Sequence, residues 1–250
     1  MKTVLITGAT SGIGKATAFE LAKSNFRLII CGRRRDRLRA IEKELAQLTQ
    51  VTALSFDVRD KKAVFSAIDS LSGEFKEIDI LINNAGNAHG LDPVQTGDLE
   101  DWDAMMDINV KGLLYVSKAI IPDMTKRKRG HIINIGSSAG KEVYPKGAVY
   151  CASKHAVIAI TEGMRIDLNP FDIKVSSINP GLVETEFSKV RFKGGEKADN
   201  VYKGYKALQA EDVAEIIAFT ISRPSHVNIA DLLVFPAAQA SSTIVKKELN

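Results

Sequence analysis

Residues 4–14 read VLITGATSGIG, an apolar run followed directly by a glycine-rich turn. The run Val4–Thr7 is short and rich in aliphatic and β-branched residues, which predicts a buried strand. Helical spacing of apolar residues then begins at Ile13 and continues to Ser24. A strand, a glycine-rich turn and a helix in this order open a βαβ unit, because glycine lets the backbone turn tightly between the two elements.

The alternation of short apolar runs and amphipathic stretches extends along the whole chain. Further strands are predicted at 28–31, 52–56, 78–83, 131–135, 175–179 and 232–235. Further helices are predicted at 36–48, 61–75, 99–124, 149–168 and 211–221, with Asp36 and Asp60 as N-caps. Because most of the strands are continuously apolar, they suit a parallel sheet that is covered on both faces. The sequence therefore predicts the α/β class, as a single-domain Rossmann-type doubly wound parallel sheet over residues 1–250 with helices on both faces.

One segment breaks the alternation of strands and helices. From Pro180 to about Gln209 the chain is irregular, with several glycines and many charged residues. Long irregular segments in compact domains often cover a binding site. We therefore expect a substrate lid at about residues 181–209.

Composition argues against several classes of partner. The 34 basic and 30 acidic residues give a net charge of only +4, spread along the chain, which favours neither nucleic acid nor membrane as a partner. No apolar run reaches the roughly 20 residues of a membrane-spanning helix, and no leader sequence is apparent, so a cytoplasmic protein is expected. Cys31 and Cys151 fit two reduced thiols.

Two further features are given ordinary explanations. The four histidines show no metal-ligand spacing, so no metal is predicted; they are His89, His131, His155 and His226. The basic run 126–129 follows a helical stretch, where cations complement the helix dipole. An RNA-binding patch is the alternative for that run, but aromatic residues are not interleaved with it.

The glycine-rich turn is a candidate site for a diphosphate group. Backbone N–H groups can approach a diphosphate closely there, and the N-terminus of the following helix adds partial positive charge. The spacing is G-x-x-x-G-x-G, and an ordinary tight turn is the alternative. The predicted dinucleotide-binding residues are Gly8, Thr10, Ser11, Gly12, Ile13 and Gly14.

Arginines after the second strand decide which dinucleotide is expected. An acidic residue about 20 positions beyond the glycines would bind the ribose hydroxyls of NAD, whereas arginine there accommodates the 2′-phosphate of NADP. Arg33 and Arg34 occupy this position, so NADP is predicted. A solvated basic turn is the alternative, and Asp36 could also serve as a ribose ligand. Asp57-Val58, after the third strand, is a candidate for adenine contacts, although Asp57 also suits a helix cap or turn.

Tyr150 and Lys154 carry the predicted chemistry. They are four residues apart in a predicted helix, so they share one face. A free phenol has a pKa of about 10, and a nearby ammonium group would lower it, so Lys154 is expected to make Tyr150 an effective proton acceptor. Tyr150 would then exchange a proton with an alcohol oxygen as hydride is transferred. A tyrosine and a lysine paired on a helix surface are the alternative.

Ser137 and Asn109 complete the predicted site. Ser137 follows the fifth predicted strand, where its hydroxyl can hold the substrate oxygen beside the phenol. Asn109 is expected to anchor a water molecule that relays protons to Lys154.

Taken together, these motifs resemble the short-chain dehydrogenase/reductase family over essentially the whole chain. The pieces that match in order and spacing are Thr7–Gly14, Asp57-Val58, Asn83-Asn84-Ala85-Gly86, Asn109, Ser137, Tyr150 with Lys154, and Asn179-Pro180-Gly181. The resemblance implies a catalytic set of Asn109, Ser137, Tyr150 and Lys154. Tyr150 and Lys154 are also expected to contact the cofactor, with Lys154 holding the nicotinamide ribose. It further implies cofactor contacts from Asn84, Ala85, Gly86, Pro180, Gly181, Val183 and Thr185.

A closer resemblance is to the NADP-dependent 3-hydroxy acid dehydrogenases. The stretches that carry it are Gly32-Arg33-Arg34 with Arg37-Leu38, Gly130–Ser137, Thr185–Gly194 and His226–Ile229. It implies oxidation of L-serine, L-allo-threonine, 3-hydroxyisobutyrate and related 3-hydroxy acids by a homotetramer. The loop from Gly181 to Thr185 is one residue shorter than in that group, which affects the details of the lid.

The substrate carboxylate implied by this resemblance needs a cation near the site. Arg191 is the better candidate, because its guanidinium matches a carboxylate, and Lys193 is the other. Both could instead face solvent or a neighbouring subunit. A 3-oxoacyl thioester or broad-specificity carbonyl reductase, and a non-catalytic NADP(H) sensor, are the alternative functions.

Overall fold

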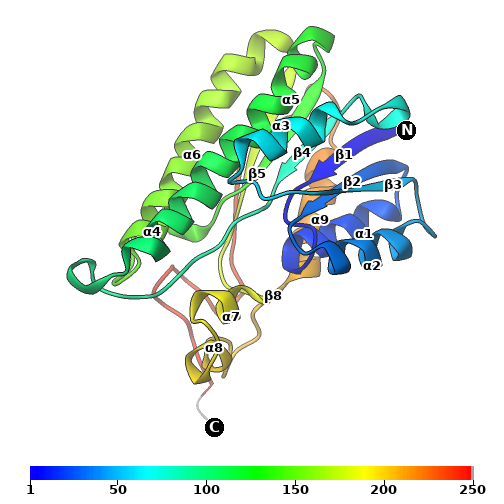
Figure 1. Cartoon of the computed structure of the whole chain (residues 1–250). Coiled ribbons are helices and arrows are strands. Elements are labelled where there is room, and N and C mark those ends of the chain that lie inside the picture. The colour runs from blue at the N-terminus through cyan, green and yellow to red at the C-terminus, as the bar shows by residue number, and fades with distance from the viewer. Residues whose placement is uncertain (249–250) are drawn as a thin grey trace.

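The computed structural model describes residues 1–248, and all seven predicted strands lie in one parallel sheet (Figure 1). Its order is β3-β2-β1-β4-β5-β6-β9. The strands are β1 Lys2–Ile6, β2 Phe26–Gly32, β3 Val51–Ser55, β4 Ile80–Asn83, β5 Gly130–Ile135, β6 Ile173–Pro180 and β9 Asp231–Val234. The long helices are α1 Gly12–Ala22, α2 Arg35–Leu45, α3 Lys61–Asp69, α4 Leu99–Met106, α5 Leu113–Arg127, α6 Ala148–Leu168 and α9 Ala210–Ile221. Short 3-10 helices span Gly73–Phe75, Val94–Thr96, Ser138–Gly140 and Asn169–Phe171.

The strand order reverses at β1. The chain moves outward from β1 through β2 to β3, and then returns to the other side of β1 as β4. In doubly wound sheets, ligands bind beyond the carboxyl ends of the strands at this reversal. The glycine-rich turn that follows β1 lies at this point, so the fold places the predicted dinucleotide site where such sites form.

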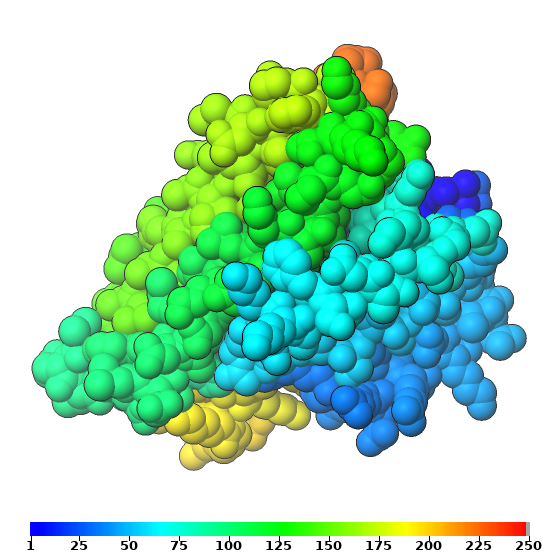
Figure 2. Space-filling model, turned by 45° about the horizontal axis from the view of Figure 1, so that its top comes forward, coloured from blue at the N-terminus to red at the C-terminus, as the bar shows by residue number. Residues whose placement is uncertain are grey.

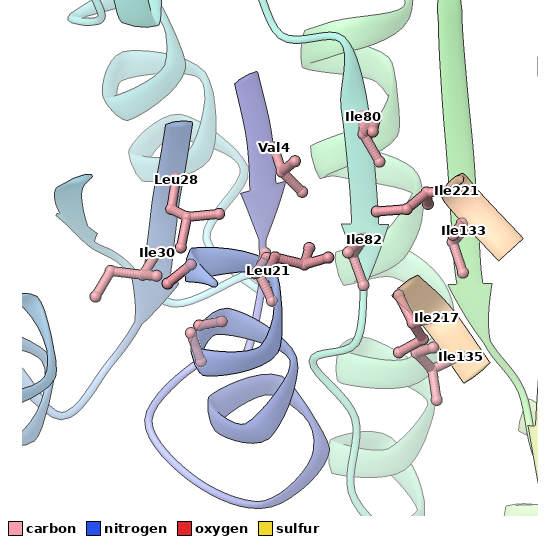
Figure 3. Packing of buried hydrophobic residues seen from close by; sticks show 14 of the residues in the cluster. Val4, Leu21, Leu28, Ile30, Ile80, Ile82, Ile133, Ile135, Ile217 and Ile221 are labelled. Carbon is pink, nitrogen blue, oxygen red and sulfur yellow. The ribbon is translucent and has the colours of Figure 1, made fainter. Parts of the chain in front are cut away.

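Helices cover both faces of the sheet, as predicted. One buried cluster joins the strands to α1, α2 and α9, and the other joins them to α3, α5 and α6. Figure 3 shows the first cluster, in which Leu21 of α1 and Ile217 of α9 lie against strand residues such as Val4 and Ile82. Each buried side chain of this size stabilises the fold by about 1.5–3 kcal/mol.

The predicted helix over residues 99–124 is not continuous. A π-helical turn, Asp107–Gly112, separates α4 from α5. Gly112 packs closely there, since a Cβ atom added to it would lie 2.7 Å from the Val58 side chain. Helical periodicity does not reveal one wider turn, and π-helical turns are frequent at functional sites. This one contains Asn109.

Of the two predicted N-caps, one is confirmed and one is wrong. The Asp60 carboxylate accepts a hydrogen bond from the Ala63 N–H at 3.0 Å and caps α3. Asp36 lies inside the first turn of α2, because the helix already begins at Arg35. There it can only complement the positive end of the helix dipole. Helix α3 also ends earlier than predicted, at Asp69, ahead of the left-handed Gly73.

The segment 181–209 is more ordered than predicted. It contains a two-stranded parallel sheet, β7 Val183–Glu184 and β8 Leu208–Gln209, and two five-residue helices, α7 Phe187–Arg191 and α8 Glu196–Asn200. Helices this short show no readable periodicity in sequence. In Figure 1, α7 and α8 lie below the sheet, beyond the carboxyl ends of the central strands.

The part of the chain that the structure describes has no helix long and apolar enough to cross a membrane. Cys31 and Cys151 are both buried free thiols, as predicted.

Candidate active site

The glycine-rich turn needs glycine at three positions. Gly8 and Gly12 have φ angles of 68° and 51°, in the left-handed region that disfavours side chains. A Cβ atom on Gly14 would lie 2.5 Å from the carbonyl oxygen of Gly8. The turn is therefore a cradle of bare backbone at the start of α1, as a diphosphate requires.

Residues that follow β4 form hydrogen bonds with the glycine-rich turn. The Asn84 side-chain amide donates to the carbonyl oxygen of Thr7 at 2.9 Å. The Thr7 hydroxyl accepts from the N–H groups of Asn84 and Ala85, both at 3.0 Å. Asn84 and Ala85 thus fix the shape of the turn. Gly86 lies further along, where an added Cβ atom would be 3.1 Å from Asn109 Oδ1.

Arg34 lies against the same turn. Its Nε and Nη2 atoms donate to the Thr10 hydroxyl at 3.1 and 3.0 Å, and Nη2 also donates to the Ser11 hydroxyl at 2.6 Å. Arg33 forms an ion pair with Asp57 at 3.3 Å. Two guanidinium groups and two hydroxyls beside a bare cradle fit a dinucleotide that carries an additional phosphate.

Asp57 and Val58 are placed at the end of β3 with different surroundings. The Asp57 carboxylate binds the Arg59 guanidinium at 2.8 Å and accepts from the Arg59 N–H. Burial raises the pKa of Asp57, but Arg59 and Arg33 outweigh it and hold that pKa below its usual value. Val58 is buried against Gly112. Their adenine contacts stay a prediction.

Lys154 and Asn109 are buried side by side next to Gly86. A Cβ atom on Gly86 would lie 3.1 Å from Asn109 Oδ1 and 3.5 Å from Lys154 Nζ. Lys154 donates to the Ile135 carbonyl oxygen at 3.1 Å. Asn109 donates to the Ser153 hydroxyl at 3.0 Å, and so connects the π-helical turn to α6.

Tyr150 is buried one helical turn before Lys154. The prediction that Lys154 lowers the pKa of Tyr150 is wrong in this structure. Burial raises the pKa of Tyr150 well above its ordinary value, while Ser137 and Arg191 lower it in part. Lys154 is not among the main groups that shift it. Burial lowers the pKa of Lys154 itself to about 8, so its own positive charge is disfavoured.

Arg191 of α7 reaches the ring of Tyr150. Its guanidinium carbon lies 5.4 Å from the ring centroid, within the range of a cation–π contact. The group also donates to the Tyr144 hydroxyl at 3.0 Å and to the Gly90 carbonyl oxygen at 3.1 Å. Within residues 1–248 it forms no ion pair. Lys193, in contrast, is paired with Asp101 at 3.0 Å.

A small cavity opens beside Tyr150 and Arg191. Its walls also include His89, Trp102 and Met105. The cavity thus lies between the predicted acid–base group, the predicted carboxylate anchor and helix α4.

The start of the segment 181–209 lies close to the glycine-rich turn. A Cβ atom on Gly12 would be 3.3 Å from the Thr185 side chain. Pro180 ends β6, the Gly181 N–H donates to the Val234 carbonyl oxygen at 2.7 Å, and Val183 is buried in β7. These four residues therefore lead from the sheet to the predicted dinucleotide site.

Several residues at this site were not identified from the sequence. Tyr144 holds Arg191, Ser153 accepts from Asn109, and the Asn87 N–H donates to Asn109 Oδ1 at 2.8 Å. Phe187 contacts the Tyr150 ring, with centroids 5.9 Å apart. Ser153 lies inside the Tyr-x-x-x-Lys motif, but the other partners come from separate elements and carry no local pattern.

Comparison with known proteins agrees with this geometry. The family model described as "short chain dehydrogenase" matches residues 2–195. The NADP-dependent 3-hydroxy acid dehydrogenase of Schizosaccharomyces pombe is 45% identical over 99% of this chain and 97% of its own length. Sulfoacetaldehyde reductase 2 of Chromohalobacter salexigens is 45% identical over 96% of each chain. The closed form of serine dehydrogenase complexed with NADP⁺ is 40% identical, with a TM-score of 0.92 over 99% of this chain and 100% of that one. This chain therefore belongs to the short chain dehydrogenase family and is an oxidoreductase that acts on CH–OH groups.

Proposed function

We propose that the protein oxidises short 3-hydroxy acids with NADP⁺ and reduces the corresponding 3-oxo acids in the reverse direction. The observation that carries this proposal is the position of Arg191. It is a cation without an ion-pair partner in residues 1–248, held 5.4 Å from the ring of the predicted acid–base group. A substrate carboxylate bound there would bring a nearby hydroxyl group to Tyr150.

The coenzyme would be held at the glycine-rich turn. Bare backbone from Gly8 to Gly14 would bind the diphosphate, and Arg33 and Arg34 would bind the 2′-phosphate. Thr185, beside Gly12, would contact the nicotinamide half. When bound, NADP⁺ supplies the hydride acceptor for the alcohol carbon.

The chain's own residues would move the proton. The Ser137 hydroxyl would hold the substrate oxygen. In reduction the Tyr150 phenol would donate its proton to the forming alkoxide, and in oxidation the Tyr150 phenolate would accept the hydroxyl proton. Lys154 lies beside Asn109 and donates a hydrogen bond to the Ile135 carbonyl oxygen. It would exchange the proton with a water molecule that Asn109 would anchor. Burial of Tyr150 and Lys154 excludes bulk solvent from this step.

The named relatives support an anionic substrate. A 3-hydroxy acid carries a carboxylate and sulfoacetaldehyde carries a sulfonate, and arginine suits either group. The test is a panel of L-serine, L-allo-threonine and 3-hydroxyisobutyrate with NADP⁺, together with sulfoacetaldehyde and an acetoacetyl thioester with NADPH. Turnover of none of the three hydroxy acids would contradict the substrate proposal. Faster reduction of the thioester would favour the alternative 3-oxoacyl reductase activity.

Reversing the charge at Arg33 tests the coenzyme assignment. In the Arg33→Asp variant, a carboxylate would face the 2′-phosphate, so the ratio of kcat/KM for NADP⁺ to that for NAD⁺ should fall about 100-fold. Arg35→Asp is the matched control, because Arg35 is an exposed arginine two positions further along, at the start of α2. An unchanged ratio in Arg33→Asp would refute the role of Arg33.

Truncating Arg191 tests the carboxylate anchor. Loss of a hydrogen bond to a charged group predicts a KM about 10- to 100-fold higher for 3-hydroxy acids in Arg191→Ala. Neutral secondary alcohols should be affected much less. Lys189→Ala, which removes an exposed cation from the same short helix, is the control. Equal effects on acidic and neutral substrates would discredit the anchor.

Three further properties belong to the proposal. The segment 181–209 is proposed as the substrate lid, the assembly as a homotetramer, and the location as cytoplasmic. Sedimentation analysis at several protein concentrations would test the homotetramer.

A further inference from the structure

Glu186 links the lid to the arginines that follow β2. Its carboxylate accepts from Arg34 Nη1 at 2.8 Å and from Arg37 Nη1 at 2.7 Å. Arg34 belongs to the predicted phosphate site, and Arg37 lies in the first turns of α2. One lid carboxylate thus joins two cations from a distant part of the sequence.

The short helix α7 carries this link to the reaction site. Glu186 directly precedes α7, Phe187 at its start contacts the Tyr150 ring, and Arg191 at its end lies over the same ring. In Figure 2, the yellow atoms of this region lie between the blue atoms of the N-terminal part and the blue-green atoms near residue 100. A change in the Glu186 contact would therefore shift the residues that face Tyr150.

The Arg34 guanidinium offers two separate edges. Nη1 binds Glu186, whereas Nε and Nη2 bind the Thr10 hydroxyl. A phosphate can take one edge of a guanidinium with two parallel hydrogen bonds. A coenzyme phosphate in place of the Thr10 contact would leave the edge toward Glu186 in use.

We propose that Glu186 is a positioning residue that couples lid closure to recognition of the coenzyme's 2′-phosphate through Arg34. This rests on the proposed function, in which Arg34 binds that phosphate. A phosphate that fixes Arg34 makes closure of the lid more favourable, and closure must strengthen phosphate binding by the same factor. Arg34 and then Arg37 also lower the pKa of Glu186, so the carboxylate stays ionised at neutral pH.

The ion pair between Arg34 and Glu186 is reversible. The side chains of Arg34 and Glu186 are 42% and 43% exposed, and ion pairs exposed to this degree are weak. The contact can therefore open and close during turnover and should weaken in high salt.

Binding of two coenzyme fragments tests the coupling. Adenosine 2′,5′-bisphosphate carries the additional phosphate, 5′-AMP lacks it, and neither fragment contains nicotinamide. In Glu186→Gln, calorimetry should show about fivefold weaker binding of the bisphosphate and unchanged binding of 5′-AMP. Glu184→Gln is the control, because Glu184 is an exposed lid carboxylate that accepts from Gln209 and, within residues 1–248, pairs with no arginine. It should bind both fragments as the wild type does.

Trypsin cleavage at Lys189 reports on the lid. The bisphosphate should protect this site in the wild type and in Glu184→Gln, and should not protect it in Glu186→Gln. Equal or tighter bisphosphate binding in Glu186→Gln, or equal protection, would overturn the coupling. If the wild type binds the bisphosphate no more tightly than 5′-AMP, the assignment of NADP fails. If the wild type prefers the bisphosphate and Glu186→Gln binds it equally well, only the coupling fails.

Discussion

Replacing Tyr150 with phenylalanine is expected to lower kcat about a thousandfold, because proton transfer by a positioned side chain contributes about 10²–10⁴-fold to a rate. The substitution removes one hydroxyl and leaves the ring that contacts Phe187 and Arg191. Affinity for NADP⁺ should change little, since the glycine-rich turn and the arginines are untouched. Steady-state rates and coenzyme titration measure the two quantities.

Tyr115→Phe provides the matched control for Tyr150→Phe. Tyr115 lies on α5 and packs against the hydrophobic cluster that joins the sheet to α3, α5 and α6. Its variant should keep the wild-type rate. A Tyr150→Phe enzyme that retained more than a tenth of the wild-type kcat would show that another group carries the proton.

The pH profile adds to this test. Because burial raises the pKa of Tyr150, the phenol keeps its proton through the neutral range in this structure. Reduction, which needs the protonated form, should therefore lose little rate between pH 6 and pH 8 through Tyr150 itself. A plot of kcat/KM against pH reports the pKa values of the acid and base groups in the free enzyme.

The central sheet could be predicted from sequence because most of the strands are local, nearly continuous apolar runs. For example, Leu28–Cys31 lies within β2, and the predicted strand needed only extension at both ends. The π-helical turn and the five-residue helix α7 could not be predicted, since neither produces a periodic pattern. These two elements are the ones that position Asn109 and Arg191.

In the candidate site, too, some relations between residues could be predicted from sequence and others could not. Tyr150 and Lys154 share one helix, so their relation follows from spacing alone. The Arg34–Glu186 pair joins residues that are far apart in the sequence, and only the fold brings them together. The pKa of Tyr150 was misjudged because the spacing shows a nearby amine but not the burial that opposes ionisation of both groups.

Lys154→Met is expected to abolish most activity while making the fold more stable at pH 7. Burial lowers the pKa of Lys154 from 10.5 to about 8. Each pKa unit corresponds to about 1.4 kcal/mol, so keeping this amine protonated costs on the order of 3 kcal/mol of folding free energy. Loss of its hydrogen bond to the Ile135 carbonyl offsets about 1 kcal/mol of the gain. Denaturant unfolding at pH 7 measures the difference, and Lys118→Met, on the exposed face of α5, is the control.

The pH dependence of stability distinguishes this cause from simple repacking. Between about pH 8 and pH 10.5 the folded enzyme has released the Lys154 proton, while the unfolded chain still holds it. The free energy of unfolding must therefore rise with pH in this window through Lys154, because the unfolded state binds more protons. Below pH 8 the cost of burying the charge is fully present. Lys154→Met should lack this rise and Lys118→Met should keep it. If the free energy of unfolding depended on pH in the same way in Lys154→Met and in the wild type, a nearby negative charge would have to offset the effect of burial on the pKa of Lys154.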